Sequence, residues 1–175
     1  MAINVRRFAP HEWRLYRDLR LRALIDAPDA FGSTFEREAA REDAEWENRL
    51  SVGATAHGQL PVVALIDEMP VGLAWCRLDE QDPTVAQIFQ VWVSPDYRGQ
   101  GVGRQLTDAV IAWARTLGVR TLRLGVTPSH PAALQLYRQA GFVSAGAAEP
   151  LRPGSLVLCQ PMRLTLEVGI PDQSA

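Results

Sequence analysis

The chain has 175 residues, of which 47% are hydrophobic and 22% are charged, and its formal net charge is −2 at pH 7. This length supports a single domain with a sizeable apolar core, and we assign that domain to residues 1–167 with a frayed tail at 168–175. Because the charge provides no basic excess for a nucleic-acid backbone or an anionic membrane surface, neither partner is expected.

All 18 basic residues are arginine. The absence of lysine excludes Schiff-base chemistry, attachment of pyridoxal phosphate and the lysine of a phosphate-binding P-loop. The three histidines lack the helical spacing of a catalytic metal site, so no metal is expected. Cys76 and Cys159 are too few for a disulfide framework, and the longest apolar run, residues 60–66, is too short to span a bilayer. We therefore expect a cytoplasmic protein.

The first half of the chain predicts one strand, two helices and three further strands. In chain order they are a strand at 2–8, a helix from Pro10 to about residue 27, a second amphipathic helix at 35–50, and strands at 61–67, 71–78 and 85–93. The tripeptide Glu68-Met69-Pro70 separates the first two strands of the last group and predicts a hairpin turn.

The second half of the chain predicts two helices alternating with strands. In chain order they are a helix at 101–117, a strand at 121–126, a helix opened by Pro131, and strands at 142–145 and 155–166. Gly118 and Gly141 follow the two helices where a residue in the left-handed conformation commonly ends a helix. The predicted order is β-α-α-β-β-β-α-β-α-β-β, which is an α/β arrangement.

Residues 91–104 combine the end of a strand, a short loop with glycines at 99, 101 and 103, and the start of a helix. Glycines let the backbone approach a ligand closely, and the free amides at a helix N-terminus attract an anion such as phosphate. The loop lacks the Gly-Lys-Ser/Thr of a Walker motif and the GxGxxG spacing of a Rossmann motif. A glycine-rich turn that only starts a helix remains an alternative, as does a nucleotide-binding module.

Two patterns in the chain resemble the GCN5-related N-acetyltransferase (GNAT) superfamily. Arg98-x-x-Gly101-x-Gly103 is similar to the family's acyl-CoA loop, Q/R-x-x-G-x-G/A. Residues 130–142, His-Pro-Ala-Ala-Leu-Gln-Leu-Tyr-Arg-Gln-Ala-Gly-Phe, are similar to a second family pattern except that His130 stands where the family has Asn. The resemblance covers residues 3–166 and implies a mixed, mostly antiparallel central sheet flanked by helices.

The resemblance also implies acetyl-CoA as co-substrate and a primary amine of a small molecule or of a peptide or protein as acceptor. The cofactor-binding residues that it implies are Val91, Val93, Arg98, Gly99, Gln100, Gly101, Val102, Gly103, Arg104, His130 and Tyr137. Members of the family often form dimers, so a homodimer is a further expectation. A non-catalytic acyl-CoA sensor of the same fold is the alternative function.

Tyr137 is the implied catalytic acid, which would protonate the departing CoA thiolate. Its alternative interpretation is a core tyrosine on an apolar helical stripe. His130 contacts the cofactor, caps the following helix or replaces the family's Asn without a function of its own. Some relatives carry a glutamate base at the position of Gln87, and an amide cannot act as a base. The carboxylates considered in its place, none of which is assigned, are Glu36, Glu38, Asp79 and Glu80.

The acceptor pocket has candidates among the arginines and aromatic residues of the first two helices and the central strands. They are Arg20, Phe31, Trp46, Trp75, Phe89 and Trp92. Because aromatic residues at helix or strand spacing usually pack in the core, we expect only about two of them to contact an acceptor.

Overall fold

The computed structural model describes residues 2–167. Its helices and strands are, in chain order, β1 (Ile3–Arg7), α1 (Trp13–Asp26), α2 (Phe35–Ala39), α3 (Asp43–Thr55), β2 (Gln59–Ile66), β3 (Met69–Leu78), β4 (Val85–Val93), α4 (Val102–Thr116), β5 (Thr121–Val126), α5 (Pro131–Gln139), β6 (Val143–Ser144), β7 (Glu149–Pro150) and β8 (Leu158–Thr165). The predicted tail at 168–175 lies outside the described residues. The assignment of residues 1–167 to one domain stays a prediction.

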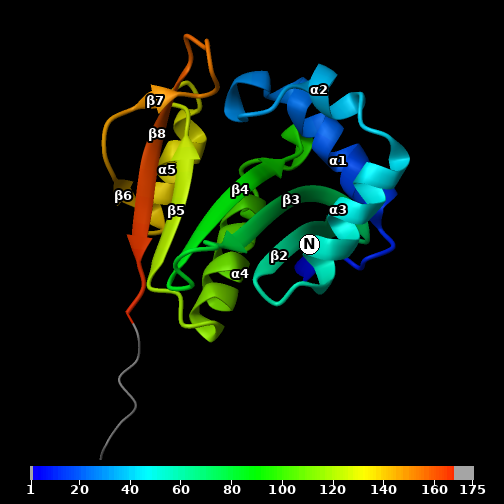
Figure 1. Ribbon diagram of the computed structural model, residues 1–175, viewed down its shortest axis with the longest axis horizontal. Coiled ribbons are helices and arrows are strands. Elements are labelled where there is room, and N and C mark those ends of the chain that lie inside the picture. The colour runs from blue at the N-terminus through cyan, green and yellow to red at the C-terminus, as the bar shows by residue number, and fades with distance from the viewer. Residues whose placement is uncertain (1, 168–175) are drawn as a thin grey trace, which may run out of the picture.

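The strands form one eight-stranded sheet in the order β1-β2-β3-β4-β5-β8-β6, with β7 also pairing with β8 (Figure 1). Every neighbouring pair is antiparallel except β4 and β5, which are parallel. The expected mixed, mostly antiparallel sheet flanked by helices is therefore confirmed.

Strands β4 and β5 separate soon after they begin. They pair only where residues Val85, Ala86 and Gln87 face Thr121, Leu122 and Arg123. Beyond this point β4 continues beside β3 and β5 continues beside β8, so the two strands diverge as they run toward their C-terminal ends (Figure 1). The divergence leaves a V-shaped opening in the middle of the sheet.

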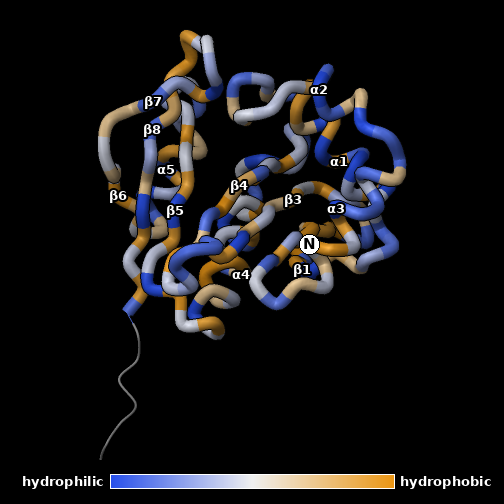
Figure 2. Tube along the Cα trace, viewed as in Figure 1, coloured by the Kyte–Doolittle hydropathy of each residue, from blue (hydrophilic) through white to orange (hydrophobic). Residues whose placement is uncertain are grey.

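Helices cover both faces of the sheet and bury two apolar cores. On one face α1 and α3 pack on the central strands over an aromatic core that includes Tyr16, Trp46 and Trp75. On the other face α4 buries Leu106 and Val110, and Tyr137 of α5 joins the same core. Figure 2 shows the hydrophobic stretches on α4 and on the central strands. Among the described helices, none combines the length and apolarity that crossing a membrane requires.

The predicted helix ends at Gly118 and Gly141 are confirmed. Both glycines have positive φ angles, of 72° and 100°. After α5 the amide of Phe142 donates to the carbonyl of Tyr137 at 3.0 Å, and after α4 the amide of Val119 donates to Ala114 at 3.1 Å. These bonds are typical of a helix terminated by a left-handed residue, so the local chemistry of glycine sets both ends.

Two helix predictions in the first half were wrong in their bounds. The first helix begins at Trp13 rather than at Pro10. The single helix expected at 35–50 is two helices, α2 and α3, because the chain turns between them and α3 restarts with its own N-terminal hydrogen bond, from the amide of Glu42 to Oε2 of Glu45 at 2.9 Å. A glutamate seldom caps a helix, so the restart carried no usual sequence signal.

Two strand predictions also needed correction. The hairpin turn between β2 and β3 is formed by Asp67 and Glu68, whose φ angles are 48° and 64°, while Met69 and Pro70 belong to β3. A two-residue hairpin turn requires a positive φ at both of its positions, and Asp67 and Glu68 meet this requirement. The turn therefore lies earlier in the chain than the expected residues 68–70. The last strands are β6 and β8, shorter than the predicted 142–145 and 155–166, and the two-residue strand β7 was not expected.

Candidate functional site

The glycine loop between β4 and α4 keeps its backbone open. Gly99 and Gly101 have φ angles of 73° and 91°, and a Cβ built on either would meet nothing within 4 Å. The first backbone hydrogen bond of α4 runs from the amide of Gln105 to the carbonyl of Gly101 at 3.0 Å. The amides of residues 102–104 therefore have no acceptor within the helix and carry its partial positive charge, as an anion site requires.

The side chain of Arg98 holds the loop in place instead of pointing freely at a ligand. Its Nε donates to the carbonyl of Val93 at 3.0 Å, and its Nη2 pairs with Asp26 at the end of α1. Asp26 also accepts a hydrogen bond of 2.8 Å from Nε1 of Trp92. Arg104, by contrast, is exposed and lies 3.6 Å from Asp108. Arg98 thus joins α1, the end of β4 and the loop.

A bulge in β4 lies beside the V-shaped opening. The pairing of β3 with β4 shifts between Leu73 and Trp75, and Gln90 has a φ of 58°, which is unusual for a residue with a side chain. The buried hydroxyl of Tyr16 donates to Oε1 of Gln90 at 2.7 Å. This bond holds the bulge, and with it the backbone of Val91, against α1.

The end of β4, the start of α4 and helix α5 meet at one point. A Cβ built on Gly103 would lie 3.0 Å from Cδ2 of Leu136 and 3.8 Å from Cγ2 of Val93. A side chain at this position would need Leu136 to move by a few tenths of an ångström, so glycine favours the close approach. The contact brings the loop next to the helix that carries Tyr137.

Tyr137 is buried and packs edge-on against Phe142, with 5.8 Å between ring centroids. Among the described residues its hydroxyl has no hydrogen-bond partner, whereas a buried core tyrosine usually has one. Burial raises the pKa of Tyr137, so its hydroxyl stays protonated and can donate. The ring contributes to the core, and the hydroxyl remains available.

His130 occupies the residue before α5, yet its side chain makes no capping hydrogen bond. The prediction that its ring could cap the helix was therefore wrong. Its Nε2 is buried and has no partner within residues 2–167. A buried ring nitrogen without a partner is costly, which fits a site that a ligand completes.

None of the four carboxylates considered as bases lines either of the two cavities described below. Glu38 is buried among three arginines, and Oδ1 of Asp79 accepts the amides of Gln81 and Asp82 at 2.9 and 3.0 Å. Burial alone would raise the pKa of Glu38, but Arg49 and the other arginines outweigh it and lower that pKa, which makes a poor base. Glu36 and Glu80 are exposed.

A different carboxylate, Glu149, lines a cavity of about 830 Å³ together with Gln87 and Arg123. Glu149 is the only acidic residue among the described residues that line this cavity. It is brought there because β7 pairs it with Cys159 of β8. Sequence reasoning missed Glu149, since a two-residue strand leaves no periodic signal.

Most of the acceptor-pocket candidates are core residues, as expected. Five of the six are buried, and Phe89 is half-buried. Trp75 and Phe89 stack with 6.0 Å between centroids and line a second cavity, of about 410 Å³. Within residues 2–167 there is no group of three or more His, Cys, Asp or Glu that could hold a metal ion.

The model of the Acetyltransferase (GNAT) family matches residues 19–142. The chain belongs to this GNAT family. A mycothiol acetyltransferase of Stackebrandtia nassauensis is 30% identical over 144 residues, which cover 81% of this chain and 44% of that protein. The chain thus spans less than half the length of that curated relative.

Solved structures of GNAT proteins share the fold. An acetyltransferase of the family from Streptococcus pneumoniae superimposes with a TM-score of 0.80 at 21% identity, covering 95% of this chain and 100% of that chain. The yncA protein of Salmonella typhimurium, solved with its cofactor acetyl-CoA, gives a TM-score of 0.75 at 20% identity and covers 99% of each chain. Both likenesses concern the fold alone.

Proposed function

We propose that this GNAT chain transfers the acetyl group of acetyl-CoA to a primary amine of a small molecule or of a peptide or protein. The observation that carries the proposal is the meeting of three features beside the V-shaped opening: the free amides of α4, the end of β4 and the Tyr137 helix. Together these features place an anion site next to a protonated hydroxyl. This combination suits a thioester that carries phosphate groups.

The residues present fit acetyl-CoA. The amides of residues 102–104 and the open backbone at Gly99 and Gly101 would hold its pyrophosphate, and Nε2 of His130 would gain a partner. The backbone of Val91 and the amide of Val93 would contact the pantetheine chain, since the carbonyl of Val93 already accepts from Arg98. When bound, acetyl-CoA supplies an acetyl group activated as a thioester.

We assign the proton donation to Tyr137. As the amine nitrogen forms its bond to the acetyl carbon and the carbon–sulfur bond breaks, the sulfur takes up the electron pair and the hydroxyl of Tyr137 supplies its proton. The assignment rests on the position of this hydroxyl next to the glycine loop and on its lack of another partner among the described residues; the raised pKa keeps the phenol protonated but does not make it a stronger acid.

The amine must lose a proton for the reaction to balance, and we assign its acceptor to Glu149, directly or through water. An aliphatic amine has a pKa near about 10.4 and is mostly protonated at neutral pH. Glu149 and Gln87 line the same larger cavity, and Gln87 stands at the position where the resemblance places the glutamate base of some relatives.

The alternative is an acyl-CoA sensor without transfer activity, which the amide of Gln87 at the expected base position favours. A panel of amines assayed by release of free CoA thiol distinguishes the two, together with the thermal midpoint of the chain with and without CoA. Ligand that binds only the folded chain raises the midpoint. We expect a rise with CoA and thiol release that depends on the amine.

Stabilisation by CoA with no amine-dependent release favours the sensor. Stabilisation by NAD or ATP at matched concentration, without any by CoA, would contradict the proposal and favour a nucleotide-binding module. A cytoplasmic location, a homodimer and the absence of nucleic-acid and membrane partners stay predictions.

A further inference from the structure

Strand pairing assembles a row of polar residues across the sheet. Gln59 pairs with Arg77, Arg77 with Gln87, Gln87 with Arg123 and Arg123 with Arg163. Directly paired residues share one face of a sheet. Their chain neighbours lie in the core beneath α4, so this cross-strand row faces the side that α1 and α3 cover.

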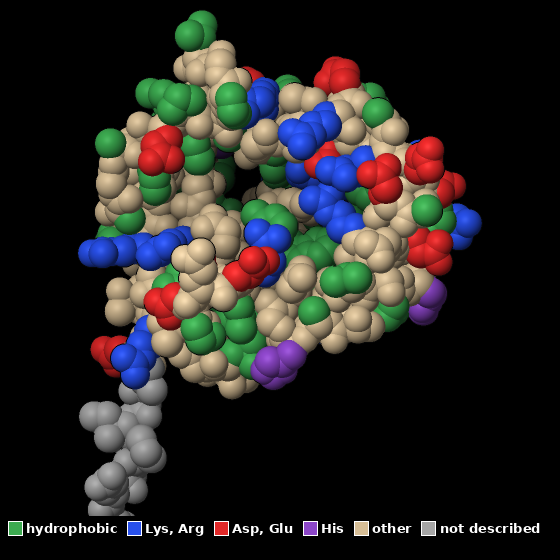
Figure 3. All heavy atoms as spheres, viewed as in Figure 1, with side chains coloured by type: hydrophobic (Ala, Val, Ile, Leu, Met, Phe, Trp, Pro, Cys, Tyr) green, Lys and Arg blue, Asp and Glu red, His purple; other side chains and the backbone are tan. Residues whose placement is uncertain are grey.

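The three arginines of the cross-strand row are exposed and have no carboxylate of their own. None of Arg77, Arg123 and Arg163 forms an ion pair within the described residues. Figure 3 shows basic side chains, all arginine in this chain, gathered across this face around a hollow. The whole chain has a net charge of −2, so the positive charge on this face comes from its local arrangement of arginines and not from the overall composition.

The smaller cavity adjoins the row and has an excess of positive charge. Arg41, Arg49 and Arg77 line it with a single carboxylate, Glu45. Its floor includes the stacked rings of Trp75 and Phe89, and the guanidinium of Arg77 lies 5.5 Å from the Phe89 ring centroid. The cavity therefore offers a flat apolar surface with cations at its edge.

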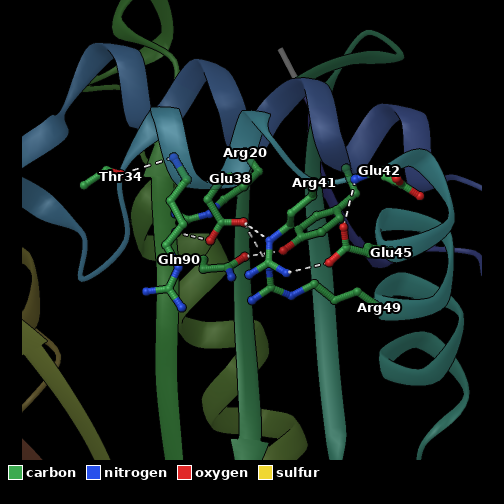
Figure 4. Close-up of polar contacts among 10 residues, drawn as sticks. Arg20, Thr34, Glu38, Arg41, Glu42, Glu45, Arg49 and Gln90 are labelled. Atoms are coloured by element: carbon green, nitrogen blue, oxygen red, sulfur yellow. Dashed lines mark hydrogen bonds and ion pairs between the residues drawn. The ribbon is translucent and has the colours of Figure 1, made fainter.

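Buried charges next to this cavity also indicate an excess of positive charge. Glu38 contacts Nε of Arg41 at 2.9 Å, Nη1 of Arg49 at 3.2 Å and Nη2 of Arg20 at 3.9 Å (Figure 4). Three arginines thus share one carboxylate. The Arg20 side chain is only 4% exposed, and its Nε and Nη1 have no acceptor within residues 2–167. An unpartnered buried guanidinium is costly unless an anion lies near it.

The phosphates of CoA are not the anions that this charge requires. The glycine loop follows Val93, whereas the row crosses β4 at Gln87, six residues earlier and about 20 Å away along the strand. The loop also leads into α4 on the opposite face of the sheet. The arginines are therefore available to a second molecule.

We propose that the acceptor is an amine whose molecule also carries a carboxylate or phosphate group, held by the arginines that line the smaller cavity, with its apolar part on Trp75 and Phe89. This inference rests on the proposed function and specifies its substrate class. It excludes polyamines as acceptors. The second ammonium group of a polyamine would lie near Arg41, Arg49 and Arg77, and Glu45 alone would not offset this repulsion.

The test compares matched amines that differ in one group. 4-(Aminomethyl)benzoate and 4-(aminomethyl)benzamide share the ring and the amine and differ only in the negative charge. 4-(Aminomethyl)phenylphosphonate replaces the carboxylate, and spermidine is the polyamine. Affinity is measured by titration calorimetry on the full chain saturated with CoA. We expect one or both anionic probes to bind at least about tenfold more tightly than the benzamide, and spermidine not to bind.

Arg77→Gln is the test variant, because Arg77 is exposed and its loss leaves no buried carboxylate unpaired. It should weaken the anionic probes about tenfold and leave the benzamide unchanged. Arg115→Gln, an exposed arginine of α4 on the other face, should change neither. Equal affinities for the charged and neutral probes, no binding of any probe, or tighter binding of spermidine would overturn the inference.

The same titration without CoA separates this inference from the proposed function. If CoA fails to bind the wild-type chain, the proposed function is wrong, and the preference among the probes can still be measured. If CoA binds and the anionic probes show no preference, only the substrate class is wrong.

Discussion

The hydroxyl of Tyr16 on α1 donates a hydrogen bond of 2.7 Å to the side-chain carbonyl of Gln90 on β4, and both residues are buried. Gln90 has the left-handed backbone of the β4 bulge, with a φ of 58°. The helix layer on one face of the sheet therefore holds the strand conformation at the V-shaped opening.

Tyr16→Phe should lower the free energy of unfolding by about 1–3 kcal/mol, because the buried carbonyl of Gln90 loses its donor. If the bulge positions Val91 for the cofactor, the KM for acetyl-CoA should rise as well. Chemical denaturation and steady-state kinetics measure the two effects. The double variant Tyr16→Phe/Gln90→Met should lose less unfolding free energy than the two single variants lose in sum. Additive losses would mean that the hydrogen bond does not couple these residues.

Tyr137→Phe removes the hydroxyl and keeps the ring that packs on Phe142. Turnover should fall at least about tenfold if the chemical step limits the rate, since general acid catalysis contributes about 10²–10⁴-fold. Affinity for CoA and the melting midpoint should change much less. Full turnover with a lowered midpoint would show that Tyr137 is only a core residue.

Glu149→Gln should lower turnover near neutral pH, where the amine needs a proton acceptor. The loss should shrink as pH rises toward the pKa of the amine, about 10.4, because more of the amine is then already neutral. A pH–rate profile of the variant against wild type measures this. Glu80→Gln, an exposed carboxylate outside the larger cavity, serves as the control, and an equal loss at every pH would argue against proton transfer to Glu149.

Glu38→Gln should destabilise the fold by about 3 kcal/mol at neutral pH, because three arginines lose their shared carboxylate while Arg41 and Arg49 can still reach water. Glu36→Gln on the same helix is exposed and should have little effect. Thermal unfolding of both variants against wild type measures the difference.

The pH dependence of that difference follows from the pKa of Glu38. The three arginines lower this pKa in the fold from its ordinary value of 4.5, so the carboxylate stabilises the fold above that value. The contribution is lost as pH falls through the lowered pKa. The gap in stability between wild type and Glu38→Gln should therefore close in acid, and a gap independent of pH would contradict the ion cluster.

Features that depend on local backbone chemistry could be predicted from the sequence. Glycines at 101, 118 and 141 mark a loop and two helix ends because each adopts a positive φ that other residues avoid. The loop and the Tyr137 helix were found in this way. The early divergence of β4 and β5 was not predicted.

Features that depend on distant contacts could not be predicted. Gln90 lies in a run of strand-forming residues, and its left-handed backbone becomes visible only with Tyr16 beside it. The cross-strand row joins Arg77 to Arg123 through Gln87, and pairing register is not readable from one sequence. The role of Arg98 at the cofactor stays a prediction, and the pairing of its guanidinium with Asp26, far back in the chain, could not be predicted from the sequence.

Amine-dependent release of CoA by Gly101→Asp, compared with Gly118→Asp, tests the central claim most directly. Both glycines have positive φ angles, 91° and 72°, and open space at a built Cβ, so both variants bear similar backbone strain at opposite ends of α4. Gly101→Asp should lose CoA binding and transfer, since its carboxylate would face the pyrophosphate site, and Gly118→Asp should retain both. Wild-type CoA affinity and turnover in a folded Gly101→Asp variant would remove the glycine loop from the active site and contradict the account.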